Sequence, residues 1–200
     1  WGLDLLEGRP NGRLLSYDPK SRKTRTVCDN LVFPNGVCLT HDGRHLLVAS
    51  TWGCSILIFD LNDLSAGPRV FLDGLPGYPD NVNRSSDGGY WIPLAGMRNP
   101  IMDQAMKYPR LRQRMSRRVP PTNWLFGNLN IGGVLKIDGA GKIVDALWDA
   151  PDGPLYMITS MREHKGSLFL GGVTNDKIGR LELEDADRDW TGPQSYRGRS

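Results

Sequence analysis

Short apolar runs, separated by Gly, Pro, Asp and Ser, cover most of the chain and predict β-strands. The stretch at residues 33–43 sets the pattern for the others. It reads as an aromatic-Pro pair, an amide, a short strand and an Asp-Gly turn, and a second strand follows at 44–49. Two strands joined by a short loop that contains Asp-Gly predict a β-hairpin.

The same pattern returns 45 residues later at 78–88, followed by a strand at 89–94, and a less regular copy occupies 157–171. A repeat of about 40–50 residues with four strands in each unit is typical of β-propeller blades. The sequence therefore predicts an all-β propeller.

Further apolar runs raise the number of predicted strands to thirteen, which amount to about three blades. They lie at 12–18, 22–28, 55–60, 68–72, 133–138, 142–148 and 177–183. The run at 55–60 is almost entirely apolar, as expected for a strand covered on both faces. A propeller needs at least about four blades to close. Because the chain also opens within a motif, we expect two or three further blades upstream. The alternative is that the chain completes its ring by association.

The third repeat follows the second after 78 residues, which predicts an insert at about 95–128. Within it, 99–108 and 109–119 predict two short helices, each with Pro near its first turn. The apolar positions expected to share one stripe are Ile101, Ala105, Leu111 and Met115. The cations expected on the opposite side are Lys107, Arg110, Arg112, Arg114, Arg117 and Arg118. This side is either a solvated helical face, a cap over the propeller mouth, or a surface that contacts anionic membrane lipid.

The predicted organisation is a partial propeller domain at 1–189 and a flexible C-terminal tail at 190–200, which is rich in Gly, Pro, Arg and Ser. Hydrophobic content of 39% and mean hydropathy of −0.40 fit a chain with a globular core. A net charge of +3 is too small to indicate a nucleic-acid partner. Cys28, Cys38 and Cys54 lack metal-binding spacing and are expected to be free thiols.

Asn35 and Asp80 occupy the same position in two successive repeats, just before the innermost strand. In a propeller these positions face the central channel, so we expect the two side chains to converge, with Asn81 as a further donor. Their oxygens are hard ligands that suit Ca²⁺ or another divalent cation. The alternative is that all three are turn residues that bond to nearby backbone.

Several motifs together resemble the strictosidine synthase-like proteins, a family that includes the adipocyte plasma-membrane-associated protein and is related to paraoxonases and gluconolactonases. The segments that carry the resemblance are 5–15, 33–37, 79–81 and 162–166. The resemblance implies a six-bladed propeller, of which this chain is the C-terminal part.

The resemblance also implies a metal site. In the calcium-dependent hydrolases of this superfamily, an Asn before Gly and an Asp after Pro bind the central cation, and these positions match Asn35 and Asp80. The paraoxonase pattern also matches Asn81. The other ligands, a Glu and an Asn, would lie in the missing blades. The true synthases replace these metal positions and use a Glu that aligns with Tyr156 here, which disfavours their condensation of an amine with an aldehyde.

Three functional hypotheses follow. The leading one is a calcium-dependent hydrolase of small esters or lactones, similar to an arylesterase or lactonase, in which Asp80 helps to activate water. The second is a non-catalytic propeller that binds a ligand or a partner. The third is a synthase-type lyase. The partners expected are a small ester or lactone, no nucleic acid, and a membrane surface through the basic insert.

Overall fold

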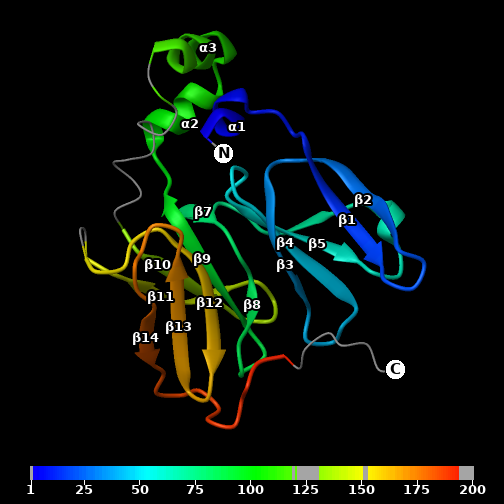
Figure 1. Ribbon diagram of the computed structural model, residues 1–200, viewed down its shortest axis with the longest axis vertical. Helices are drawn as coiled ribbons and strands as arrows, with labels where there is room; N and C mark the ends of the chain where they lie inside the picture. Colours follow the sequence, from blue (N-terminus) through cyan, green and yellow to red (C-terminus); the bar gives the residue numbers. More distant parts are fainter. Residues whose placement is uncertain (1, 119, 121–130, 151–152, 194–200) are drawn as a thin grey trace.

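The computed structural model describes residues 2–118, 120, 131–150 and 153–193. Within these residues the chain forms four antiparallel sheets and three α-helices (Figure 1). The first sheet pairs β1 (Gly12–Asp18) with β2 (Lys23–Leu31). The second is a meander of β3 (Pro34–Leu39), β4 (His45–Ser50), β5 (Ser55–Asp60) and β6 (Arg69–Leu72), with a short 3₁₀ helix, η1 (Leu64–Ala66), before β6.

The third and fourth sheets follow the same up-and-down order along the chain. The third contains β7 (Gly77–Pro79), β8 (Asn83–Arg84), β9 (Tyr90–Met97), β10 (Gly133–Ile137) and β11 (Ile143–Trp148). The fourth contains β12 (Ile158–His164), β13 (Ser167–Gly172) and β14 (Gly179–Glu182). The predicted strands are therefore confirmed, except for the innermost strand of the third sheet.

An apolar core lies between each pair of consecutive sheets. The first and second sheets bury Leu14, Leu31, Val48 and Phe59. The second and third sheets bury Leu47, Ala49, Ile56, Tyr90, Ile92, Leu94, Leu135 and Ile137. The third and fourth sheets bury Trp91, Val134, Ile158, Met161 and Leu168. Sheets stacked face to face in chain order form a propeller-type arrangement.

Neighbouring residues of the inner strands serve different cores. Leu47 and Val48 are adjacent in β4 and fully buried, but they lie in separate cores, as side chains on opposite faces of a strand must. In β5, Ile56 and Phe59 divide in the same way. This confirms that the continuous apolar run at 55–60 reflects a strand covered on both faces.

The innermost strand of the third sheet differs from the prediction, because it is split into β7 and β8, which both pair with β9. This raises the described strands to fourteen. Pro79 and Pro93 face this ladder and have no N–H to donate. The Asp80 N–H still donates to the Pro93 carbonyl at 3.1 Å, but regular pairing stops over residues 80–82. The backbone of residues 80–82 is therefore outside the regular ladder, and the Asp80 carbonyl accepts a hydrogen bond from the second sheet instead.

The two predicted helices are confirmed as α2 (Pro100–Met106) and α3 (Pro109–Arg118). Asn99 caps α2 by accepting a hydrogen bond from the Ile101 N–H at 2.9 Å. A third helix, α1 (Gly2–Glu7), was not predicted, and it packs against α3 at one end of the molecule (Figure 1). We call α1, α2 and α3 the helical cap. Within the described residues, no helix is long and apolar enough to cross a membrane.

The predicted division of the insert into an apolar stripe and a basic side was partly wrong. Ile101 and Leu111 are exposed, while Met102 takes an inner position beside Ala105 and Met115. Arg112 is buried instead of facing solvent. The reason is that α1, which the prediction lacked, presents backbone carbonyl groups to this guanidinium.

The ends of two predicted segments lie outside the described residues. These are 119 and 121–128 of the insert, and 194–200 of the C-terminal tail. At the start of the predicted C-terminal tail, the Trp190 carbonyl accepts a hydrogen bond from the Lys165 N–H at 2.7 Å. Cys28, Cys38 and Cys54 are free thiols, as expected. Burial raises the pKa of Cys54 to about 11, which makes its thiol unreactive.

Candidate metal centre

Asn35 and Asp80 converge because the innermost strands of the second and third sheets meet at their starts. The Gly36 N–H, at the beginning of β3, donates to the Asp80 carbonyl at 2.8 Å. A β-carbon at residue 36 would lie 2.4 Å from the Asn81 α-carbon, so only glycine permits this approach. The backbones of two consecutive repeats are therefore locked together at the predicted site.

The Asp80 carboxyl group is half-buried, and no positively charged partner for it is found among the described residues. Burial raises its pKa from 3.8 to about 6, and a side-chain hydrogen bond with Asn35 opposes this rise only in part. No Lys, Arg or His among the described residues contributes to the shift. A desolvated carboxylate without a counter-charge is a favourable place for a cation.

Asn81 connects this centre to the fourth sheet. Its Nδ2 atom donates to the Thr159 carbonyl of β12 at 2.7 Å and lies 3.3 Å from Asp80 Oδ1. Because the amide nitrogen makes both contacts, the amide oxygen is left for another partner. Three consecutive sheets thus contribute groups to one place: Asn35 from the second, Asp80 and Asn81 from the third, and Thr159 from the fourth.

Thr51 is a further member of the centre that the sequence did not indicate. Its hydroxyl is buried, donates to the Pro79 carbonyl at 2.8 Å, and lies 3.4 Å from Asn35 Nδ2. Thr51 follows β4, and only the pairing of β3 with β4 brings it beside Asn35. No sequence motif carries that information.

The residues present fit a hard divalent cation. One carboxylate and two amide side chains offer oxygen donors of the kind that Ca²⁺ prefers. Among the described residues, no group of three or more His, Cys, Asp or Glu side chains could hold a metal. The centre at Asp80 depends on amides as well as on one acid, and a further protein ligand would complete it.

A cavity of about 430 Å³ lies between the loop that follows β4 and helix α2 with the residues that precede it. Its lining residues are Trp52, Arg98, Pro100, Asp103, Gln104, Met106 and Lys107. Trp52 directly follows Thr51, makes a tilted contact with the Phe33 ring and an edge-on contact with the Tyr78 ring, and donates from its indole N–H to Asp4 of α1 at 3.1 Å. Trp52 therefore links the cavity to α1 through Asp4 and to β7 through Tyr78, which precedes Asp80 by two residues.

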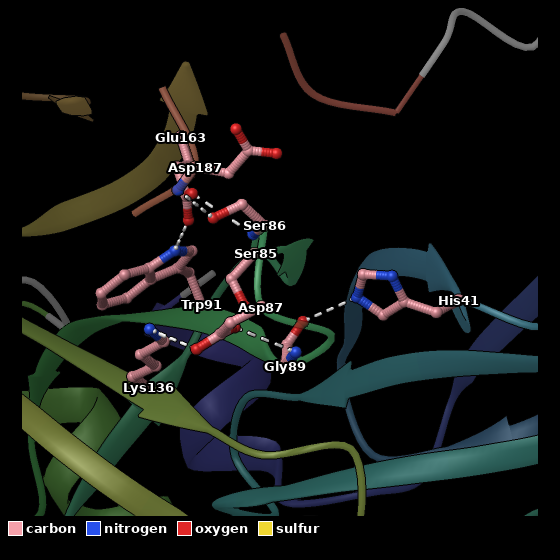
Figure 2. Close-up of polar contacts among 9 residues, drawn as sticks. All are labelled: His41, Ser85, Ser86, Asp87, Gly89, Trp91, Lys136, Glu163 and Asp187. Atoms are coloured by element: carbon pink, nitrogen blue, oxygen red, sulfur yellow. Dashed lines mark hydrogen bonds and ion pairs between the residues drawn. The ribbon is translucent and has the colours of Figure 1, made fainter. Parts of the chain in front are cut away.

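The other end of the β8–β9 hairpin is held by a polar network (Figure 2). Glu163 of β12 is buried and accepts hydrogen bonds from the Trp91 indole at 2.7 Å and from the Ser86 N–H at 3.2 Å. Lys136 forms an ion pair with Asp87 at 2.6 Å. Burial alone would raise the pKa of Asp87, but hydrogen bonds from Lys136 and the turn lower it.

Figure 2 also shows how the network extends to the second sheet. The Gly89 carbonyl is 3.0 Å from His41 Nε2, and the Ser86 hydroxyl accepts from the Asp187 N–H at 3.2 Å. Glu163 lay in a motif that carried the family resemblance, but the sequence assigned it no role. The structure shows that it joins the third and fourth sheets.

Tyr156, the position aligned with the synthase acid, is half-buried before β12. Its carbonyl accepts a hydrogen bond from Asn175 Nδ2 at 2.7 Å. The side chain at this position is a phenol and not the carboxylate that amine chemistry would use there.

Comparisons with known sequences agree with the resemblance. A family model described as strictosidine synthase matches residues 1–59. The adipocyte plasma membrane-associated protein of Bos taurus is 32% identical over 186 residues, which are 90% of this chain and 45% of that protein. The protein strictosidine synthase-like 6 of Arabidopsis thaliana is 34% identical over 187 residues, 92% of this chain and 48% of that protein. The chain thus spans about half the length of these relatives.

Comparisons with solved structures agree with the fold. A calcium-binding protein, regucalcin, from Agrobacterium tumefaciens superposes with a TM-score of 0.56 at 14% identity, covering 92% of this chain and 56% of that one. A gluconolactonase from Xanthomonas campestris gives a TM-score of 0.55 at 19% identity, covering 86% of this chain and 44% of that one. At such low identity these likenesses establish the propeller-type fold alone.

Proposed function

The chain belongs to the strictosidine synthase-like family, and from this premise we propose that it is part of a calcium-dependent hydrolase of esters or lactones. The observation that carries the proposal is the meeting of Asn35, Asp80 and Asn81 around a half-buried carboxylate without a counter-charge. The proposal includes a six-bladed propeller, of which the four sheets here, two of them incomplete, form about three blades.

Each of the three residues has a distinct task in this proposal. Asp80 would supply the negative charge for Ca²⁺. The amide oxygens of Asn35 and Asn81 would be the other two ligands that this chain provides. When bound, the cation would polarise the substrate carbonyl and stabilise the oxyanion. Thr51 and Thr159 position the two amides through the contacts described above. Asp80 also lies where it could accept a proton from an attacking water.

We further propose that the cavity lined by Trp52 and α2 holds the substrate. Trp52 and Met106 offer an apolar wall for the alkyl or aryl part of an ester or lactone. Arg98 also lines the cavity and is held by its ion pair with Asp103 at 3.1 Å, and Lys107 adds a second cation to the lining. We therefore expect a small substrate that combines an apolar group with a polar or anionic end.

The test combines metal binding with turnover, using protein that contains residues 1–200. Asn35→Ala and Asp80→Asn should lose Ca²⁺ binding in calorimetry and lower hydrolysis across an ester and lactone panel by at least about 100-fold. Asp145→Asn is the matched control, because Asp145 is exposed on β11 and contacts only the adjacent backbone.

Hydrolysis that survives in both centre variants would refute the proposal. Calcium binding without turnover in the wild type would instead favour the non-catalytic ligand-binding alternative. Condensation of an amine with an aldehyde, dependent on Tyr156, would favour the lyase.

A further inference from the structure

The outer side of the helical cap carries a dense group of exposed cations, which we call the cap basic face. It consists of Arg110, Arg114, Arg117 and Arg118. Helix α3 contains no acidic residue, and none of these four side chains forms an ion pair or hydrogen bond with the described part of the chain. The charges are therefore available to an external partner.

The charge of the whole chain is distributed very unevenly. Its net charge is +3, so the four cations of the cap basic face exceed it and the rest of the chain is close to neutral. A positive cluster on an otherwise nearly neutral chain would orient the molecule towards an anionic surface with the cap leading. In Figure 1, α3 lies at the end of the molecule farthest from the fourth sheet.

The inner side of α3 holds this face in a fixed orientation. Arg112 is 7% exposed and donates to the Leu6 carbonyl at 2.9 Å and the Glu7 carbonyl at 3.3 Å, both at the end of α1. It also donates to the Met106 carbonyl at the end of α2. One buried arginine thus joins all three helices, while Arg114, Arg117 and Arg118 of the same helix are exposed.

Apolar side chains stand beside the cations on the same cap. Ile101 is 74% exposed, Tyr108 is 59% exposed and Leu111 is 46% exposed. A polyanion such as DNA would gain little from these groups. Binding to a lipid bilayer would be favoured by both the cations and the apolar side chains. Anionic headgroups attract the cations, and the apolar side chains enter the boundary between headgroups and acyl chains.

We propose that the cap basic face docks the protein on the surface of an anionic phospholipid membrane. This inference rests on the charges and exposure of the cap alone and does not depend on the hydrolase activity. Each Arg or Lys near such a surface contributes about a five-fold increase in partitioning, so the cluster gives useful affinity without a membrane span.

The experiment measures co-sedimentation of the protein with vesicles of phosphatidylcholine containing about one-third phosphatidylserine, against vesicles of phosphatidylcholine alone. Arg114→Glu/Arg118→Glu should weaken binding to the anionic vesicles by about 30-fold or more. Lys23→Glu/Arg25→Glu makes the same charge change at exposed positions of β2 and should leave binding within about two-fold. Leu111→Ser should mainly reduce the binding that persists at high salt.

Equal losses in the cap and β2 variants would overturn the proposal, since they would indicate an effect of net charge alone. Equal binding to the two vesicle types, or no binding at low salt, would overturn it as well. Tighter binding to a double-stranded DNA oligonucleotide than to anionic vesicles would assign the face to nucleic acid instead. Circular dichroism of both double variants verifies that the cap helices remain folded.

Discussion

Residue 36 shows how one missing side chain permits the candidate centre. Gly36 brings β3 within hydrogen-bonding distance of the Asp80 carbonyl, and a β-carbon there would meet backbone atoms of both Asp80 and Asn81. Backbone cannot move aside as a flexible side chain can. The contact between two repeats is therefore specific for glycine.

We expect Gly36→Ala to destabilise the protein by about 2–3 kcal/mol and to weaken Ca²⁺ binding, because the overlap separates Asn35 from Asp80. Urea denaturation and calorimetry measure the two effects. Gly43→Ala is the control: its φ of +68° makes alanine strained, but nothing lies within 4 Å, so the cost should be about 1 kcal/mol without loss of binding. Similar effects of both variants would contradict this explanation.

Asp80 gives a second prediction at this scale. Its pKa is about 6 in the folded protein and 3.8 as the reference value, so the folded state binds more protons between these values. Without metal, the contribution of Asp80 to the free energy of unfolding therefore falls as pH rises from about 4 to about 6. Asp80→Asn should remove this dependence and stabilise the calcium-free protein at pH 7 by on the order of 1–3 kcal/mol.

The measurement is chemical denaturation of wild type and variant at a series of pH values with a chelator present. Added Ca²⁺ should stabilise the wild type and not the variant, because only a ligand that binds the folded state raises stability. A variant less stable than the wild type at neutral pH, with chelator, would contradict the assignment of a desolvation penalty to Asp80.

At the scale of elements, the helical cap depends on a polar group in its interior. The guanidinium of Arg112 satisfies carbonyl groups at the ends of α1 and α2, which have no partners within their own helices. Charge-assisted bonds to backbone oxygens offset the cost of burying it. The cap is thus fastened by one side chain as well as by Met102, Ala105 and Met115.

Arg112→Ala should loosen the cap, with a local loss of about 2–4 kcal/mol, because buried carbonyl groups lose their donor and a space remains. Hydrogen exchange of α1 and α3 amides measures the change. Arg114→Ala should alter stability by less than about 0.5 kcal/mol, since Arg114 is exposed without a described partner. Protection in α1 that is unchanged in Arg112→Ala would show that apolar packing alone holds the cap.

At the scale of the whole molecule, the sheets are joined at both ends of their inner strands. Gly36, Asp80 and Asn81 join three sheets at the candidate centre, and Glu163 joins the third and fourth sheets at the hairpin end. Between these ends lies the core around Trp91 and Met161. Relative positions of the sheets are therefore set at two places along each strand.

We expect Glu163→Ala to destabilise the protein by about 2–3 kcal/mol, because the buried Trp91 indole N–H loses its acceptor. Glu163→Gln keeps an acceptor and should cost only about 1 kcal/mol. Urea denaturation compares the two with Glu184→Ala, an exposed control expected to change stability by less than about 0.5 kcal/mol. Equal costs for the Ala and Gln variants would contradict the hydrogen-bond explanation.

The strand pattern, the repeat and the convergence of Asn35 with Asp80 were readable from the sequence, because they depend on local periodicity and on the phase of a repeat. In β4 and β5, apolar residues on both faces of the strand pack in separate cores, which the nearly continuous apolar run of β5 had indicated. Helices α2 and α3 were readable from their Pro positions. The proposed roles of Asn35, Asp80 and Asn81 in metal binding stay predictions.

Only the tertiary structure decided which groups of distant segments meet. Thr51, Thr159 and Glu163 acquire their contacts from strand register and sheet stacking, and Arg112 is buried only because α1 returns to the insert from the start of the chain. The split of the innermost strand likewise depends on Pro93 facing it from β9. Local propensity determines elements, whereas contacts across many residues depend on how those elements pack, and no short motif records that packing.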